Sequence, residues 1–306
     1  MTGVIINKIQ NRKNKMAISK KEFDILTLLE SGNSIDNLKA EETLSILIEK
    51  GYVKDGKITE CGLDALEPYR VKRAVLTAAG FGSRMVPITL TTPKPLVKVN
   101  GVRIIDTILD AVLGAGIDDI YIVRGYKAEM FDVLKEKYPM VKFIDNPLYN
   151  VTNNISSGYV ARHLFANSYI LEADMVIYNP KILSKYQYRT GYMGIYMEYT
   201  DDWYAVTDEN GVIVSRGHGG GRNCYQGVGI TYWTEEDGKR LEKDIAHVFE
   251  NVPDSKDKFW GYVPYIYYKD KYPIYAIGCK AEDIIEIDTF EELCQIDPTY
   301  KDFKAE

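Results

Sequence analysis

Two glycines, an arginine and a lysine follow a short apolar run and form a candidate phosphate-binding turn. The run 73–79 (RAVLTAA) is bounded by charge, as a buried parallel strand would be. Gly80 and Gly82 come next, and glycines let the backbone approach a phosphate closely, so that its N–H groups point at the anion. Arg84 offers a planar donor fork for phosphate oxygens, and Lys94 offers a second positive charge further on. The segment therefore predicts a site for a phosphorylated ligand.

This turn matches neither of two common phosphate-binding motifs. No GK[ST] follows the glycines, so the turn is not a Walker A loop. The letters GFGSRM also lack the third glycine of a dinucleotide fingerprint, and no acid clearly plays the ribose-binding role. The specific feature is the combination of GxGxR and PKPL directly after a strand.

Two further segments end in carboxylates that could hold a metal ion. Residues 166–175 form an apolar strand that ends in acids, and residues 283–289 repeat the arrangement. A carboxylate at the carboxyl end of a strand in an open α/β sheet faces the ligand crevice. Mg²⁺ prefers few carboxylates together with phosphate oxygens and water, and two aspartates with a nucleoside triphosphate meet that need. Either acid could instead cap a helix or form a salt bridge.

The segment AVLTAAGFGSRMVPITLTTPKPLVKVNG resembles the signature of nucleotidyltransferases that activate phosphorylated small molecules with an NTP. The resemblance covers about residues 73–306 and implies a catalytic domain with a doubly wound, Rossmann-like α/β fold and a mixed central sheet. It implies that Asp174 and Asp288 hold Mg²⁺ as the cofactor, and that Lys94, Arg84 and Asp174 are catalytic. It also places the nucleotide against a set of residues in and after the first strand: Ala78, Ala79, Gly80, Phe81, Gly82, Ser83, Arg84 and Lys94.

The segments that follow alternate between helix and strand patterns. Residues 104–115 and 127–138 read as helices, and residues 119–123 and 141–144 read as strands. Strands that alternate with helices of this length indicate βαβ units, which agrees with the fold that the resemblance implies.

Residues 150–159 (NVTNNISSGY) complete a YxxxNNxxS pattern. This pattern resembles the CTP:phosphocholine branch of the family more than the sugar-phosphate branches. By that analogy Asn154, Ser156 and Ser157 lie near the nucleotide and the acceptor, although Ser156 would equally suit a helix N-cap.

Tyrosine is the one compositional outlier, with 24 copies, most of them in the second half of the chain with all three tryptophans. Such residues suit half-buried β-strands, or a few of them line a substrate pocket. Phosphocholine requires an aromatic box, which holds a trimethylammonium group by cation–π attraction on the order of 0.5–2 kcal/mol per contact. Trp203 and Trp260 are the first candidates and Tyr192 and Tyr196 the next, while the family places Tyr126 in a substrate-side loop.

The first seventy residues predict a separate small domain. Residues 1–15 form a basic tail, and residues 16–72 give the order helix, helix, hairpin, helix, with Asp55 and Gly56 at the hairpin turn. This order is similar to a small winged helix. The helix expected at 38–50 is rich in acids, whereas a DNA-reading helix presents basic or amide side chains. We therefore expect a docking or dimerisation module rather than DNA binding.

Composition excludes several classes of protein. With 306 residues the chain has room for about two domains. Its net charge of -6 argues against a polyanion-binding protein as a whole, and no apolar stretch is long enough to cross a bilayer. The four cysteines are scattered without a CxxC pair, so neither a zinc site nor a disulfide framework is indicated. Without a signal-peptide pattern at its start, the protein is expected in the cytoplasm.

The predicted reaction transfers CMP from CTP to phosphocholine and yields CDP-choline and pyrophosphate. An alternative acceptor is 2-aminoethylphosphonate, whose primary amine favours carboxylates over an aromatic box. A sugar-1-phosphate comes next, and Glu172 and Met175 depart from the pattern of sugar transferases. From another class, the winged-helix part could make the protein a ligand-sensing regulator, but intact Lys94, Asp174 and Asp288 argue against an inactive catalytic domain. The sequence leaves open the acceptor, the base preference and whether the chain forms a homo-oligomer.

Overall fold

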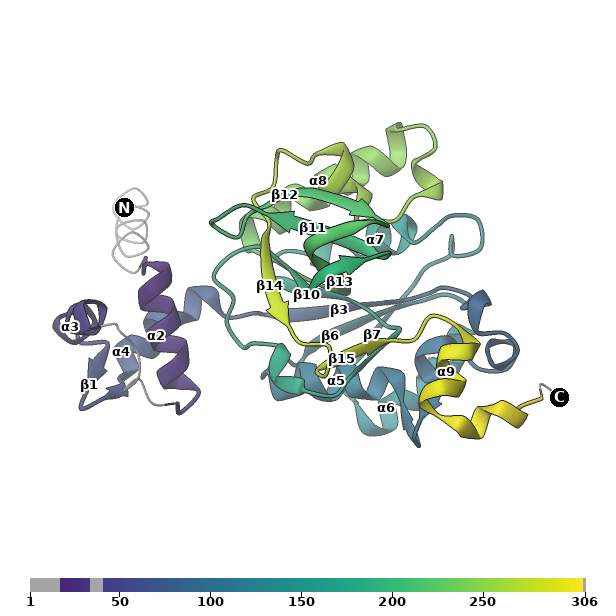
Figure 1. The fold of residues 1–306 in the computed structure, drawn as a ribbon, viewed down its shortest axis with the longest axis horizontal. Coiled ribbons are helices and arrows are strands. Elements are labelled where there is room, and N and C mark those ends of the chain that lie inside the picture. The colour runs from purple at the N-terminus through teal and green to yellow at the C-terminus, as the bar shows by residue number, and fades with distance from the viewer. Residues whose placement is uncertain (1–16, 34–40, 305–306) are drawn as a thin grey trace, which may run out of the picture. The chain divides into compact units, whose positions relative to one another are not determined.

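The computed structural model describes residues 17–33 and 41–304, and the chain divides into two compact units (Figure 1). The smaller unit comprises Met1–Arg70 and Tyr186–Tyr188, and the larger unit comprises Val71–Lys185 and Arg189–Glu306. The basic tail predicted at 1–15 and the start of the helix predicted from residue 38 lie outside the described residues.

The smaller unit contains three helices within its described residues. They are α2 (Lys20–Glu30), α3 (Glu41–Glu49) and α4 (Glu60–Leu66). The side chain of Ser19 accepts from the backbone N–H of Glu22, whose carboxylate accepts from the Ser19 N–H, so a capping box begins α2. After α4 the chain tightens into a 3₁₀ turn, because Pro68 has no N–H to continue the α-helical pattern.

A short hairpin follows α3 in the smaller unit. Strands β1 (Val53–Lys54) and β2 (Lys57–Ile58) are antiparallel, and both turn residues have positive φ, 50° at Asp55 and 72° at Gly56. Two positive values are what a type I′ turn requires, and Asp-Gly is a preferred sequence for it. Beside this hairpin, the small hydrophobic core includes Leu26, Leu47, Val53, Leu66 and Tyr186.

Parallel strands form the centre of the large sheet in the larger unit. In spatial order they are β8 (Ser168–Glu172), β3 (Arg73–Ala78), β6 (Asp119–Arg124) and β7 (Lys142–Asp145). The register sets Thr77 beside Glu172, so the end of β3 and the end of β8 open onto the same edge of the sheet. Ligands of open α/β sheets bind outside this carboxyl edge.

Antiparallel strands extend the sheet beyond β8 and make it mixed. They are β13 (Gly221–Trp233), β10 (Gly191–Thr200), β11 (Trp203–Thr207) and β12 (Ile213–His218), with β14 (Tyr275–Cys279) parallel to β10. This architecture confirms the predicted α/β fold with a mixed central sheet.

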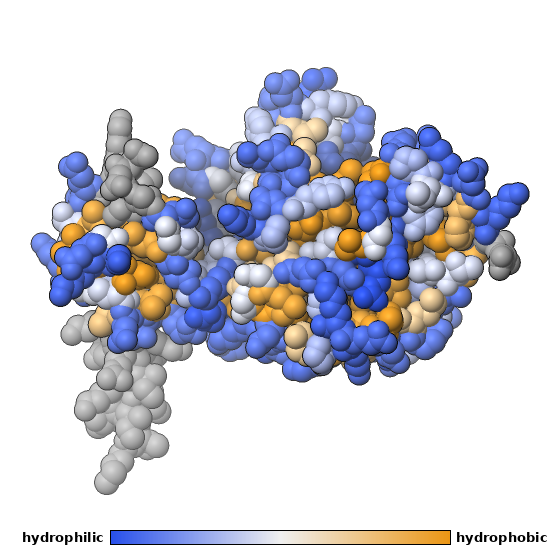
Figure 2. Space-filling view, turned by 90° about the horizontal axis from the view of Figure 1, so that it is seen from below, coloured by the Kyte–Doolittle hydropathy of each residue, from blue (hydrophilic) through white to orange (hydrophobic). Residues whose placement is uncertain are grey.

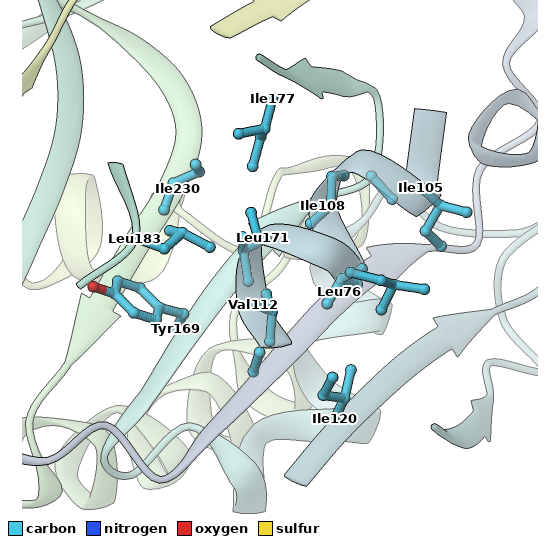
Figure 3. Close-up of a cluster of buried hydrophobic side chains, with 14 of the residues drawn as sticks. Leu76, Ile105, Ile108, Val112, Ile120, Tyr169, Leu171, Ile177, Leu183 and Ile230 are labelled. Atoms are coloured by element: carbon cyan, nitrogen blue, oxygen red, sulfur yellow. The ribbon is translucent and has the colours of Figure 1, made fainter. Parts of the chain in front are cut away.

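Helices cover both faces of the sheet, as Figure 1 shows. On one face lies α5 (Ile104–Gly114), with α6 (Leu134–Lys137) after a 3₁₀ segment, and on the other lie α7 (Ile155–Ala161) and α8 (Glu235–Asn251). Figure 3 shows α5 side chains such as Ile108 and Val112 packed against Leu76 of β3 and Leu171 of β8. Alternate residues of β3, such as Val75, enter the core on the opposite face.

A two-stranded ribbon joins a segment near the end of the chain to a segment from the middle of the sequence. Strand β15 (Ile284–Glu286) pairs antiparallel with β9 (Met175–Ile177), so that Glu286 lies opposite Met175. The Ile287 N–H donates to the Asp174 carbonyl at 3.1 Å just beyond the ribbon. This pairing holds the two acidic segments side by side.

Within the described residues, no helix is both long and apolar enough to span a membrane. On the face seen in Figure 2, hydrophilic side chains are interspersed with smaller apolar patches.

Candidate active site

The turn after β3 depends on a glycine that packs against the stem of Lys94. Gly82 has a φ of +64°, and a Cβ there would lie 3.0 Å from Thr89 Cγ2 and 3.1 Å from Lys94 Cβ. Thr89 Oγ1 donates a hydrogen bond to the Gly82 carbonyl at 2.9 Å. A Cβ at Gly80 would meet nothing within 4 Å, so this glycine leaves open space beside the turn. The positions of the glycine turn and of Lys94 are therefore coupled by direct packing.

The Lys94 ammonium joins the two acidic segments. Its side chain is 10% exposed, and Nζ donates to Asp174 Oδ2 and to Asp288 Oδ1, both at 3.0 Å. Burial alone would lower the pKa of Lys94, but the two carboxylates outweigh burial and raise that pKa above its ordinary value. Arg84 Nη2 donates to the same oxygen of Asp288 at 2.8 Å. Two cations and two carboxylates thus meet at the edge of the sheet.

Carboxylates outnumber cations around Asp174. One oxygen from each of Glu172, Asp174 and Glu286 lies within 4.8 Å of the others. Burial, followed by the charge of Asp174, raises the pKa of Glu172 to about 8. Burial of the carboxyl group among these acids, followed by the charges of Asp174 and Asp288, raises the pKa of Glu286 to about 9, although the residue as a whole is exposed. A cation placed here would relieve the repulsion between the carboxylates.

The donor set around Asp174 fits a divalent cation. Asp174 Oδ1 is buried and has no hydrogen-bond partner within the described residues, while its other oxygen is bound to Lys94. Mg²⁺ binds oxygen ligands, usually one or two carboxylates together with phosphate oxygens. Asp174 and Asp288, predicted as the metal ligands, are both in reach of Lys94, and Glu172 and Glu286 add carboxylates next to Asp174.

These groups line a cavity of about 1080 Å³ within the larger unit. At one end it is bounded by the glycine turn, and elsewhere by strands of the extended sheet and by residues 259–266. Most of the predicted site residues line it: Ala78, Ala79, Gly80, Gly82, Ser83, Arg84, Lys94, Asn154, Ser157, Asp174, Tyr192, Trp203, Trp260 and Asp288. Residues far apart in the sequence therefore share one space large enough for a nucleotide and a small second substrate.

Four of the predicted site residues, all of them described, are not among the residues that line the cavity: Phe81, Tyr126, Ser156 and Tyr196. The Phe81 ring packs against Tyr126, whose hydroxyl donates to the Thr89 carbonyl at 3.0 Å. Ser156 is fully buried and accepts a hydrogen bond from Asn146. It lies inside α7 rather than at its N-cap. Tyr196 is 57% exposed and contacts Tyr225 across β10 and β13.

The two predicted tryptophans differ in what they offer a ligand. Trp260 is 5% exposed, and its ring packs on Phe165 and Trp233 in the hydrophobic core. Its backbone N–H donates to Asn154 Oδ1 at 2.8 Å, which ties the segment 259–266 to the start of α7. Trp203 is 39% exposed, and its ring is available in the cavity.

An aromatic cluster surrounds Trp203. Its ring centroid lies 6.2 Å from that of Phe259 and 6.1 Å from that of Tyr262, and these two rings are 6.3 Å apart. The His218 ring approaches Trp203 edge-on at 4.9 Å. All four side chains line the cavity. Trp203 was predicted from the sequence, whereas Phe259 and Tyr262 were not, because their only signal was the aromatic density of this half of the chain.

Arg216 is a further cavity residue that sequence reasoning missed. Its guanidinium carbon lies 4.4 Å from the ring centroid of Tyr192 and 3.3 Å from that of Tyr265. Arg216 belongs to β12, an edge strand without a recognisable motif, so no sequence signal marked it.

Comparison with known proteins defines the class of protein. The nucleotidyl transferase family model matches residues 73–188. A 2-aminoethylphosphonate cytidylyltransferase from Lancefieldella rimae is 36% identical over 231 residues, which cover 74% of this chain and 92% of that relative. The chain belongs to the nucleotidyltransferase family, and the resemblance seen in its sequence is confirmed.

Further relatives place the chain among the cytidylyltransferases. The choline-phosphate cytidylyltransferase of Haemophilus influenzae is 30% identical over 72% of this chain and 93% of its own. The structure of CTP:phosphocholine cytidylyltransferase from Streptococcus pneumoniae matches with a TM-score of 0.69 at 28% identity, covering 76% of this chain and 100% of that one. The protein is thus a nucleotidyltransferase of the cytidylyltransferase group, with similar relatives named for two different acceptors.

Proposed function

We propose that this enzyme transfers CMP from CTP to 2-aminoethylphosphonate and releases pyrophosphate. The observation that supports this acceptor is the surplus of carboxylates in the cavity. Glu172 and Glu286 lie next to Asp174, and within the described residues neither forms an ion pair with a lysine or arginine. A primary ammonium group has three N–H donors, and its positive charge would lower the raised pKa values of Glu172 and Glu286, so that both groups bind it as carboxylates.

The cations at the glycine turn suit the nucleotide. The backbone of residues 80–83 and the Arg84 side chain would hold the triphosphate, since the turn is open at Gly80 and Arg84 reaches the cavity. Lys94 would stabilise the negative charge that develops on the α-phosphate and on the attacking oxygen. Bound Mg²⁺, held by Asp174 and Asp288, would supply further neutralisation of the phosphate charges.

The reaction needs no covalent enzyme intermediate. A phosphonate oxygen of the acceptor forms a new bond to the α-phosphorus of CTP, and the bond from that phosphorus to the bridging oxygen of the β-phosphate breaks. The attacking oxygen is already anionic, so no general base has to remove a proton. Catalysis then consists of positioning and charge neutralisation by the residues around Lys94.

Phosphocholine is the second candidate acceptor. The cluster of Trp203, Phe259 and Tyr262 favours it, because aromatic rings that line a cavity can hold a trimethylammonium group. This group has no N–H donors, so it would leave Glu172 and Glu286 without hydrogen bonds. The carboxylates therefore favour 2-aminoethylphosphonate as the acceptor, and the aromatic rings favour phosphocholine.

The reaction is tested by measuring pyrophosphate release for four NTPs against 2-aminoethylphosphonate, phosphocholine and glucose-1-phosphate. We expect CTP with 2-aminoethylphosphonate to give the highest kcat/KM, exceeding phosphocholine by about tenfold or more. Faster turnover of glucose-1-phosphate, or no pyrophosphate with any amine-bearing acceptor, would exclude the proposal.

Two substitutions separate the contributions of carboxylate and ring. We expect Glu286→Gln to lower kcat/KM for 2-aminoethylphosphonate by about tenfold at saturating Mg²⁺, because one charged hydrogen bond is lost. Trp203→Leu should change that value by less than about threefold, while lowering kcat/KM for phosphocholine by about tenfold. Trp203 is the informative tryptophan, since replacing Trp260 would open a cavity in the core. The opposite pattern, with the Trp203 variant unable to use the aminophosphonate, would favour an aromatic site for both acceptors.

A further inference from the structure

Arg216 is a charged residue held in the cavity wall by aromatic rings. It lies between Tyr192 and Tyr265, with its guanidinium carbon 4.4 and 3.3 Å from the two ring centroids, and all three residues line the cavity. Its Nη2 atom is buried and has no hydrogen-bond partner within the described residues. Among the described residues, Arg216 also forms no ion pair with a carboxylate. Within the described residues, the direct contacts of this positive charge are therefore with π faces.

This arrangement changes what the two tyrosines can do. A tyrosine near a cavity can attract a cationic ligand through its ring face, which was the reason to predict Tyr192 as a substrate residue. Here the face that Tyr192 turns to Arg216 is already occupied by a cation, and so is that of Tyr265. A second cation that approached these rings would meet the charge of the guanidinium.

The consequence differs between the two kinds of ammonium group. A trimethylammonium group depends on ring faces, because it has no hydrogen to donate. A primary ammonium group depends on acceptors and finds them at Glu172 and Glu286, next to Asp174. With two tyrosine faces occupied by Arg216, the trimethylammonium group therefore loses more binding contacts than the primary ammonium group does.

We propose that Arg216 is a specificity-determining residue. It lowers the affinity of the acceptor site for trimethylammonium groups relative to its affinity for primary ammonium groups. This inference rests on the proposed function in one respect, that the acceptor carries an ammonium group into this cavity. Arg216 acts through Tyr192 and Tyr265 and takes no part in the transfer of CMP.

The matched ligands are phosphoethanolamine and phosphocholine, which differ only in the three N-methyl groups. Their dissociation constants are measured by calorimetry on the full chain without nucleotide, so the result does not depend on turnover. We expect Arg216→Met, which keeps an apolar side chain between the rings, to tighten phosphocholine relative to phosphoethanolamine by about tenfold. Arg216→Lys keeps the positive charge and should leave the ratio near that of the wild type.

The control is Arg222→Met. Arg222 also stacks on a tyrosine, with its guanidinium carbon 5.3 Å from the Tyr199 ring centroid, but it is exposed and is not among the residues lining the cavity. The ratio of the two dissociation constants should not change in this variant. Thermal unfolding shows whether each variant is folded, and Arg216→Gln replaces Arg216→Met if the methionine variant is not.

An unchanged ratio in the folded charge-free variant, an equal loss of both ligands in that variant, or no detectable binding of phosphocholine to it would overturn the role of Arg216. The ratio of the two dissociation constants tests the role of Arg216, whereas pyrophosphate release tests the proposed reaction. If the wild type uses no amine-bearing acceptor, the proposed reaction fails, while the shift in binding ratio still decides whether Arg216 selects between ammonium groups.

Discussion

Lys94→Met should lower kcat by about 10²–10³ while the protein remains folded. The Lys94 ammonium is the cation that contacts both acidic segments, and its side chain is only 10% exposed at the carboxyl edge of the sheet. Methionine keeps most of the stem that packs against Gly82, so the turn should retain its shape. What the variant loses is the positive charge that we propose acts on the α-phosphate in the transition state.

The measurement is steady-state pyrophosphate release, together with thermal unfolding. Removing the ammonium leaves Asp174 and Asp288 facing each other, but both are about a quarter exposed, so water screens part of the repulsion. We therefore expect a lower Tm with unfolding still cooperative. Lys98→Met is the matched control, because Lys98 is exposed on β4 (Lys98–Val99) and is not among the residues lining the cavity. This variant should have the wild-type kcat. A Lys94→Met enzyme with wild-type kcat would show that the ammonium has no part in the chemistry.

The fold was largely predictable because its signals are local. The apolar run 73–79, the helix pattern at 104–115 and the strand at 119–123 all correspond to elements of the structure. Where the pattern was less regular, the prediction was less accurate. The helix expected over 127–138 is a 3₁₀ segment followed by one short α-helical stretch, and Lys127 just before it has a positive φ of 48°.

The glycine turn could be selected from sequence because its residues are close together in the chain. Gly82, Arg84 and Lys94 lie within one short stretch of the sequence, so a local motif can identify all three. Their spacing allows Gly82 to pack against the Lys94 side chain. The acidic segments were also selected, since each ends an apolar run. Their proximity depends on the pairing of β9 with β15, a contact across more than a hundred residues that no local pattern encodes.

The aromatic side of the cavity could be predicted only as a group of aromatic residues. Whether a ring faces the cavity or the core depends on sheet twist and on what packs behind it. Trp260 and Phe259 are neighbours in sequence, yet Trp260 is buried in the core and Phe259 is 43% exposed. Arg216 reaches its place through the pairing of β12 with β11, with Arg216 opposite Ala205. Such placements follow from tertiary packing and not from residue type.

Asp174→Asn should lower kcat by about 10²-fold and raise the Mg²⁺ concentration needed for half-maximal rate. The amide keeps the shape of the side chain but removes the charge from the buried Oδ1, the atom that has no hydrogen-bond partner within the described part of the chain. The substitution also removes an acid that raises the pKa values of Glu172 and Glu286. Loss of attraction to Lys94 is thus partly offset by loss of repulsion among the carboxylates, and we expect little change in Tm.

A Mg²⁺ titration of pyrophosphate release at fixed CTP and acceptor distinguishes a metal ligand from a residue that only orients Lys94. For a ligand, the half-saturating Mg²⁺ concentration rises by about tenfold or more, and chelation by EDTA abolishes the wild-type rate until Mg²⁺ is restored. For an orienting residue, kcat falls while the Mg²⁺ dependence stays at its wild-type position, and this result would remove Asp174 from the metal site. Asp118→Asn provides the control for charge, because Asp118 is exposed at the amino end of β6, at the opposite edge of the sheet from the glycine turn.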